Sequence, residues 1–136
     1  MTAGVLILGA GQAAAQLAIS LRQGGYAGPI RMVGDEPYAP YQRPPLSKAY
    51  LKEKASIETL LLRAEHYWRD HQVALELGVA AKAVDLTGRQ VAFGDGRAFA
   101  YDTLVFATGT RARKVRFAWY RSPATISAWI AANIAS

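Results

Sequence analysis

Three small residues at fixed spacing, Gly9, Gly11 and Ala14, follow a short apolar run and open an alanine-rich segment. The first glycine allows a tight turn, and the second lets a phosphate group approach the backbone without a side chain in the way. A small third residue allows a helix to pack closely against the preceding strand. The spacing therefore predicts that the pyrophosphate of a dinucleotide binds at the amino end of this helix, where N–H groups and the helix dipole stabilise negative charge.

Two acidic residues, Asp35 and Glu36, supply the second group that such a site needs. Asp35 lies 21 residues after Ala14, at the end of the next apolar run. One of the two carboxylates is expected to accept hydrogen bonds from the ribose hydroxyls of the adenosine half of the ligand. The alternative is that the glycines only turn a tight corner. An acid in register with both strand and helix favours dinucleotide binding.

The elements that must position these residues are a strand, a helix and a second strand. Residues Val5–Leu8 form a continuous apolar run of the kind that is buried on both faces of a parallel sheet. The helical pattern ends at Gly24 and Gly25, and Ile30–Val33 is the second apolar run. This order predicts an α/β fold of the Rossmann-like type, built on a parallel sheet.

The rest of the chain adds shorter elements to this unit. Four prolines between positions 37 and 45 predict a shaped loop, followed by a helix over 46–51. A brief strand over 60–62, a helix over 64–71 and a third parallel strand over 74–77 are expected next. From Ala81 onward, turn signals at 87–88 and 94–96 predict a small antiparallel β-meander. A buried strand over 104–107 then ends in Thr108 and Gly109.

Two longer segments are more specific than the glycine motif: PYQRPPLSK at 40–48 and YDTLVFATG at 101–109. With them, the chain from about Val5 to Lys114 resembles the FAD-binding domain of NAD(P)H-dependent ferredoxin reductases of the putidaredoxin reductase type. Flavoproteins similar to apoptosis-inducing factor share these segments. The resemblance implies FAD as the bound cofactor, NAD(P)H as the electron donor of the complete enzyme and a 2Fe–2S ferredoxin as the electron acceptor.

The resemblance also implies a role for individual residues. Lys48 is the implied catalytic residue, because an ammonium at the edge of the flavin ring stabilises negative charge as hydride arrives. A solvated lysine early in a helix is the simpler alternative. Arg43 would lie near the phosphate and ribityl region of FAD, and Ala81 would place its backbone against the adenine. The other implied FAD contacts are Gly9, Gly11, Gln12, Ala13, Ala14, Asp35, Glu36, Ala107, Thr108 and Gly109.

The residue types exclude several other kinds of site. The 136 residues contain no cysteine, which excludes a thiolate metal site and a flavin-coupled redox disulfide within this chain. Disulfide reductases similar to this family carry redox cysteines where this chain has Leu46 and Ser47. His66 and His71 have no third ligand and predict no metal site. Electrons are therefore expected to pass to an external one-electron acceptor.

The net charge of +6 is concentrated at the end of the chain. Residues 1–110 hold 11 Lys and Arg against 10 Asp and Glu, whereas 111–136 hold five basic residues and no acid. A nearly neutral folded part predicts no nucleic-acid binding.

No apolar run approaches the roughly 20 residues that span a bilayer, and no signal-peptide pattern precedes the first strand. A cytoplasmic location without a membrane partner is therefore expected.

Two regions are expected: 1–114, an incomplete FAD-binding domain of the Rossmann-like type, and 115–136, a divergent tail that reads as frame-shifted or disordered. No second glycine motif for NAD(P)H follows the first region. The favoured interpretation is the FAD-binding part of a ferredoxin reductase, inactive as this chain alone. A non-catalytic module that binds NAD or ADP-ribose, and a split enzyme completed by another chain, are the alternatives.

Overall fold

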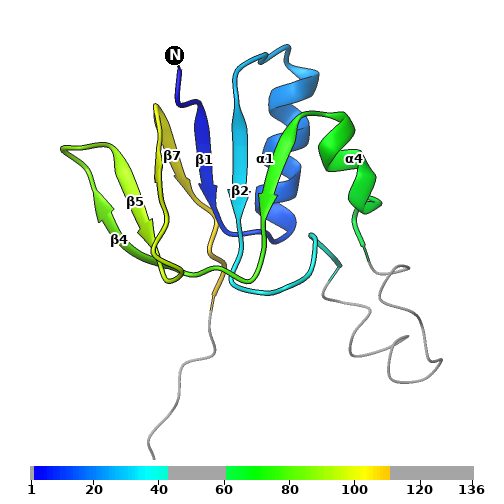
Figure 1. Ribbon diagram of the computed structural model, residues 1–136. Coiled ribbons are helices and arrows are strands. Elements are labelled where there is room, and N and C mark those ends of the chain that lie inside the picture. Colours follow the sequence, from blue (N-terminus) through cyan, green and yellow to red (C-terminus); the bar gives the residue numbers. More distant parts are fainter. Residues whose placement is uncertain (1, 43–60, 111–136) are drawn as a thin grey trace, which may run out of the picture.

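The computed structural model describes residues 2–42 and 61–110, and the statements below concern these residues. Its central feature is a parallel sheet in the strand order β3-β2-β1-β7, with a separate antiparallel sheet in the order β4-β5-β6 beside it (Figure 1). The predicted α/β class, with a parallel sheet and a small meander, is confirmed. The elements in chain order are β1 (Val5–Leu8), α1 (Gln12–Gln23), β2 (Ile30–Val33), α4 (Glu65–Asp70), β3 (Val73–Glu76), β4 (Ala81–Asp85), β5 (Gln90–Phe93), β6 (Ala98–Ala100) and β7 (Thr103–Phe106).

The carboxyl ends of the parallel strands lie level with one another. Leu8 at the end of β1 pairs with Val33 of β2 on one side and with Phe106 of β7 on the other. The segments that leave these strands therefore start from one edge of the sheet, the lower edge in Figure 1. The glycine motif leaves β1, the acidic residues leave β2 and residues 107–109 leave β7.

Strand β1 is buried on both faces, which accounts for its four apolar residues. Val5 and Ile7 belong to the hydrophobic cluster beneath α1 and α4. Leu6 and Leu8 belong to a second cluster, which the antiparallel sheet covers with Val91 and other side chains. Because successive strand residues point to opposite faces, one short strand takes part in both cores.

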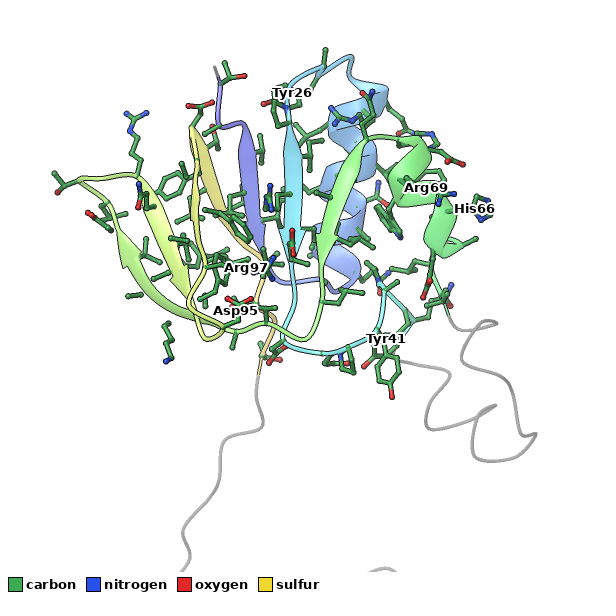
Figure 2. All side chains as sticks on the ribbon, in the orientation of Figure 1. Tyr26, Tyr41, His66, Arg69, Asp95 and Arg97 are labelled. Atoms are coloured by element: carbon green, nitrogen blue, oxygen red, sulfur yellow. The ribbon has the colours of Figure 1, made fainter. Side chains whose placement is uncertain are left out.

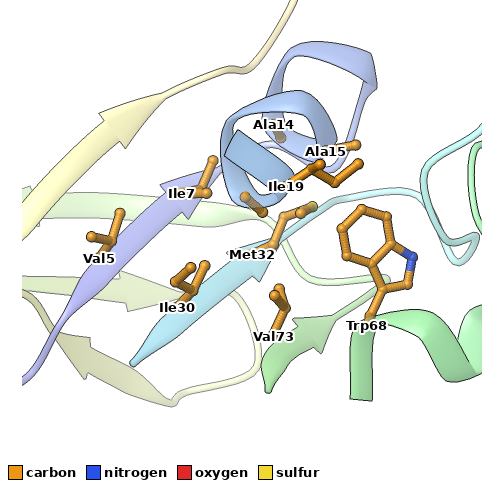
Figure 3. Packing of buried hydrophobic residues seen from close by; sticks show 10 residues of the cluster. Val5, Ile7, Ala14, Ala15, Ile19, Ile30, Met32, Trp68 and Val73 are labelled. Atoms are coloured by element: carbon orange, nitrogen blue, oxygen red, sulfur yellow. The ribbon is translucent and has the colours of Figure 1, made fainter. Parts of the chain in front are cut away.

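Helix α1 lies close to the sheet because small residues occupy its inner face. Ala14, Ala15 and Ala18 are at most 1% exposed, and Ala14 packs in the same cluster as Ile7 and Met32 (Figure 3). The predicted close packing of helix and strand at Ala14 is therefore observed. Fully burying an apolar side chain such as Met32 contributes about 1.5–3 kcal/mol. This packing fixes the amino end of α1 next to the end of β1.

A network of charged side chains joins the antiparallel sheet to the parallel one. Glu76 at the end of β3 accepts hydrogen bonds from Arg31 Nη1 at 2.7 Å and from Arg97 Nη1 at 2.8 Å. Arg97 also donates from Nε to Asp95 at 2.6 Å, and these two residues lie together in Figure 2. Both guanidinium groups lie over the ring of Phe99, at 4.0 Å for Arg31 and 5.2 Å for Arg97.

The predicted element bounds agree with the structure to within one residue in most places. The strands expected over 74–77 and 104–107 begin one residue earlier, and the helix expected over 64–71 is one residue shorter at each end. Leu61 forms an isolated bridge with Tyr41 in place of the brief strand expected over 60–62. The helix expected over 46–51 lies outside the described residues. Within the described ranges, no helix has the length and apolarity required to cross a bilayer.

Candidate functional site

A cavity of about 700 Å³ opens at the carboxyl edge of the parallel sheet. The loops that leave β1, β2 and β7 form its walls, together with the segment that enters β4. Ligands of open parallel sheets bind in this position, beyond the carboxyl ends of the strands. The lining residues are Leu8, Gly9, Ala10, Gly11, Gln12, Ala13, Val33, Gly34, Asp35, Glu36, Tyr38, Tyr41, Val79, Ala80, Ala81, Ala107, Thr108, Gly109 and Thr110.

Gly9 lies where the loop after β1 meets the segment after β7. Its φ angle of 120° favours glycine, and a Cβ atom built there would overlap the carbonyl oxygen of Ala107. The Gly9 N–H donates to the carbonyl of Val33 at 2.7 Å, and the Ala107 N–H donates to the carbonyl of Leu8 at 2.7 Å. Gly9 is therefore required by the tight turn and also by a close approach of two backbone segments.

Gly11 occupies the N-cap position of α1 in an extended conformation that any residue can adopt. A Cβ atom built there would meet nothing within 4 Å, because the position faces the open cavity. The helix has no side-chain cap and no acidic residue in its first turn. Its first backbone hydrogen bond runs from the Ala15 N–H to the Gly11 carbonyl, so earlier N–H groups have no acceptor within the helix. This end of α1 is suited to an anionic group.

The opposite wall carries the two acidic residues. Asp35 is exposed and Glu36 is half-buried. Both follow β2, whose end is held by the Gly34 N–H, which donates to the carbonyl of Glu76 at 2.9 Å. The Glu36 carboxylate accepts a hydrogen bond from the Tyr41 hydroxyl at 2.6 Å. Carboxylates at this position can accept hydrogen bonds from ribose hydroxyls.

The segment that enters the antiparallel sheet completes the cavity. The Val79 N–H donates to the Gly34 carbonyl at 2.9 Å, which fixes the segment that enters β4 beside the acidic loop. Ala80 and Ala81 line the cavity there, and their small side chains leave its wall open. A flat aromatic base needs an apolar wall with backbone groups of this kind.

The structure gathers most of the predicted site residues around this one cavity. Gly9, Gly11, Gln12, Ala13, Asp35, Glu36, Ala81, Ala107, Thr108 and Gly109 all line it. Ala14 does not line it, because its methyl group is buried between α1 and the sheet. Arg43 and Lys48 lie outside the described residues, so their expected contacts stay predictions.

Several lining residues were not predicted from the sequence. Tyr38 and Tyr41 lie in the proline-rich loop, and Thr110 follows the predicted Gly109. Gly34 belongs to no motif that the sequence analysis identified. A Cβ atom there would lie 2.6 Å from the Ala10 Cβ, which is too close for an ordinary contact. Tyr41 belongs to the segment at 40–48 that carries the family resemblance, but no role was predicted for it.

The two histidines lie away from the cavity. His71 stacks on Tyr67 with ring centroids 3.9 Å apart, and His66 is exposed on α4 (Figure 2). Over residues 2–42 and 61–110, no group of three His, Cys, Asp or Glu side chains could hold a metal ion.

Comparison with known proteins gives consistent relatives. The family model for pyridine nucleotide-disulphide oxidoreductases matches residues 3–119. A ferredoxin–NAD(P)(+) reductase of Sphingomonas sp. is 47% identical over 111 residues, which are 82% of this chain and 27% of that protein. The chain thus spans about a quarter of the length of this relative.

Solved structures of similar proteins agree with the fold. A ferredoxin reductase from Rhodopseudomonas palustris has a TM-score of 0.81 and 41% identity, covering 90% of this chain and 30% of that one. Putidaredoxin reductase in its covalent complex with putidaredoxin has a TM-score of 0.78 and 42% identity, covering 85% of this chain and 28% of that one.

Proposed function

Because the chain belongs to the pyridine nucleotide-disulphide oxidoreductase family, we propose that its cavity binds the ADP half of FAD. One observation carries this proposal: Gly11 lies at the amino end of α1, and the space that a side chain there would occupy is open to the cavity. The open position leaves room for a phosphate against the backbone, and the helix end attracts its charge. The residues present therefore fit the cofactor.

The residues around the cavity divide between the parts of FAD. Gly9, Gly11, Gln12 and Ala13 would hold the pyrophosphate through backbone N–H groups. Asp35 and Glu36 would accept hydrogen bonds from the adenosine ribose, and Ala81 would lie against the adenine. Residues 107–109 would run along the cofactor as the chain leaves β7, with Ala107, Thr108 and Gly109 on the cavity wall. Ala14 would contribute indirectly, by letting α1 lie close to the sheet.

Two further assignments rest on the resemblance of the segment at 40–48 to ferredoxin reductases. Arg43 would neutralise phosphate charge, and Lys48 would lie at the edge of the flavin ring. An ammonium there stabilises negative charge on the ring as hydride arrives. Lys48 is thus the residue that we propose to assist the chemical step.

We propose that residues 1–114 are the FAD-binding part of a protein that transfers electrons from NAD(P)H to a 2Fe–2S ferredoxin. Bound FAD can accept a hydride and release its two electrons one at a time. The relatives named above as ferredoxin reductases support this acceptor, as does the absence of any redox cysteine pair from the 136 residues. The expected location is the cytoplasm.

Titration of the purified chain with FAD tests the proposal. We expect saturable quenching of flavin fluorescence for the wild type and a loss of affinity of about tenfold or more in Gly11→Val, because the new side chain fills the phosphate position. Ala98→Val is the matched control, since Ala98 is exposed on β6 and lies outside the cavity. Equal FAD affinity in Gly11→Val and the wild type would contradict the proposal. Saturable binding of NAD or ADP-ribose, with no affinity for FAD, would favour the non-catalytic alternative.

A further inference from the structure

The loop that contains Tyr41 is anchored to the fold at several points. Ala39 is 1% exposed, and Pro40 is fully buried. The Pro40 carbonyl accepts a hydrogen bond from the Leu62 N–H at 2.8 Å, and Tyr41 forms an antiparallel bridge with Leu61. The backbone of Tyr41 is therefore held in place, and its hydroxyl group is directed by a fixed segment.

Glu36 is held from two sides. Its backbone carbonyl accepts a hydrogen bond from the Gly78 N–H at 2.9 Å, which ties it to the loop after β3. Its side-chain Oε2 accepts a hydrogen bond from the Tyr41 hydroxyl at 2.6 Å. Both Glu36 and Tyr41 line the cavity, and both are half-buried, whereas Asp35 is exposed. The Glu36 carboxylate is thus oriented by the Tyr41 hydroxyl within the cavity wall.

We infer that Tyr41 is a positioning residue, which holds the Glu36 carboxylate as a preordered acceptor for the ribose hydroxyls of a bound adenosine diphosphate group. This inference rests on the proposed function and deepens it. A carboxylate has about four acceptor positions, so the hydrogen bond from Tyr41 is compatible with further hydrogen bonds from a ribose. Ordering the glutamate before binding removes part of the entropic cost that the ligand would otherwise meet.

The test compares two probes in isothermal titration of the full chain: ADP and 2′,3′-dideoxy-ADP, which lacks the ribose hydroxyls. In Tyr41→Phe we expect the affinity for ADP to fall about three- to tenfold, a loss similar to the net contribution of one ordinary hydrogen bond. The affinity for the dideoxy analogue should stay within about twofold of the wild type, because the Glu36 contact is absent from that complex. In a Glu36→Ala background, Tyr41→Phe should have no further effect on ADP.

Tyr26→Phe is the matched control, since Tyr26 is a half-buried tyrosine at the opposite end of the sheet (Figure 2). It should change the affinity for neither probe. Equal losses for ADP and its dideoxy analogue in Tyr41→Phe would overturn the inference and assign Tyr41 a purely structural role in the loop. An unchanged ADP affinity would overturn it as well. A wild-type chain that binds neither FAD nor ADP would refute the proposed function and this inference together. If the wild type binds FAD normally, equal losses for both probes or an unchanged ADP affinity in Tyr41→Phe would refute the inference alone.

Discussion

Gly9 and Gly11 belong to one motif but are glycine for different physical reasons. Gly9 has a positive φ angle, and any side chain there would overlap the backbone at Ala107. Gly11 has an ordinary backbone conformation and open space beside it. The first glycine is therefore a requirement of the fold, and the second is a requirement of the ligand that we propose.

This difference predicts unequal losses of stability from two alanine substitutions. Gly9→Ala should lower the free energy of unfolding by about 2–4 kcal/mol, because it adds backbone strain and a clash. Gly11→Ala should lower it by about 1 kcal/mol or less, the cost of a poorer N-cap residue. Urea unfolding of both variants without ligand measures the difference, and equal losses would show that the two glycines do not have separate roles.

The glycine motif and the acidic residue of this site were easier to predict from the sequence than the contacts that hold the site together. The glycine motif and the acid after the second strand are local patterns, so they were visible in the sequence. The contact of Gly9 with Ala107 depends on how distant segments meet. The hydrogen bond of Tyr41 to Glu36 joins residues only five positions apart, but the loop that carries Tyr41 is positioned by a distant residue. Tyr41 is held by Leu61, which is 20 residues away along the chain. No local pattern reports such an arrangement.

At the scale of the elements, Arg22 connects the end of α1 to two other segments. Its Nε and Nη2 atoms donate to the carbonyls of His71 and Gln72, both at 2.8 Å. Its Nη1 atom donates to the carbonyls of Tyr26 at 2.6 Å and Gly28 at 2.9 Å. One side chain thus satisfies carbonyl groups before β2 and before β3. It stabilises the amino edge of the sheet, opposite the cavity.

Arg22→Met should therefore lower the free energy of unfolding by about 1–3 kcal/mol, since it leaves these carbonyl groups without their charged donor. Arg69→Met on α4 is the control, because that side chain is 82% exposed and its distance to Asp70 is 3.8 Å. It should change stability by about 0.5 kcal/mol or less. Thermal or urea unfolding measures both variants, and an equal decrease in the free energy of unfolding for the two would contradict this role of Arg22.

The elements themselves were largely predictable, because their apolar patterns match the faces that they bury. The four apolar residues of β1 predicted burial on both faces, and the alanines of α1 predicted close packing. Strand bounds shifted by one residue at β3 and β7, where the pairing register with β2 and β1 decides the ends. Leu61 has the local pattern of a strand residue, but among the described residues it forms an isolated bridge with Tyr41.

At the scale of the whole molecule, the two sheets of the described part share the core around β1 and Val91. The charged network of Arg31, Glu76 and Arg97 adds a polar connection between them. Asp95 extends this network, and hydrogen bonds from the backbone and side chain of Arg97 lower the pKa of its carboxyl group below the usual 3.8. The cavity lies along the same boundary, so the relative placement of the sheets shapes its wall.

The lowered pKa of Asp95 predicts a pH dependence of stability. A carboxyl group with a depressed pKa in the folded state stabilises the fold above its unfolded-state pKa. That contribution is lost as the pH falls through the lower folded-state pKa. Asp95→Asn should therefore be less stable than the wild type at pH 7, by a small amount because the site is exposed. The difference in urea midpoint should shrink as the pH falls below 3.8. A difference that is independent of pH would contradict this origin.

We propose that the cavity at the carboxyl edge of the parallel sheet binds the ADP half of FAD. The most direct test is to record backbone amide resonances of the ¹⁵N-labelled chain during titration with FAD. We predict that the amides of Gly9, Gly11 and Thr108 shift or broaden as FAD is added, and that those of Tyr26 and Gly28 at the opposite edge do not. Saturable changes confined to the opposite edge, or no changes at the cavity, would contradict the claim.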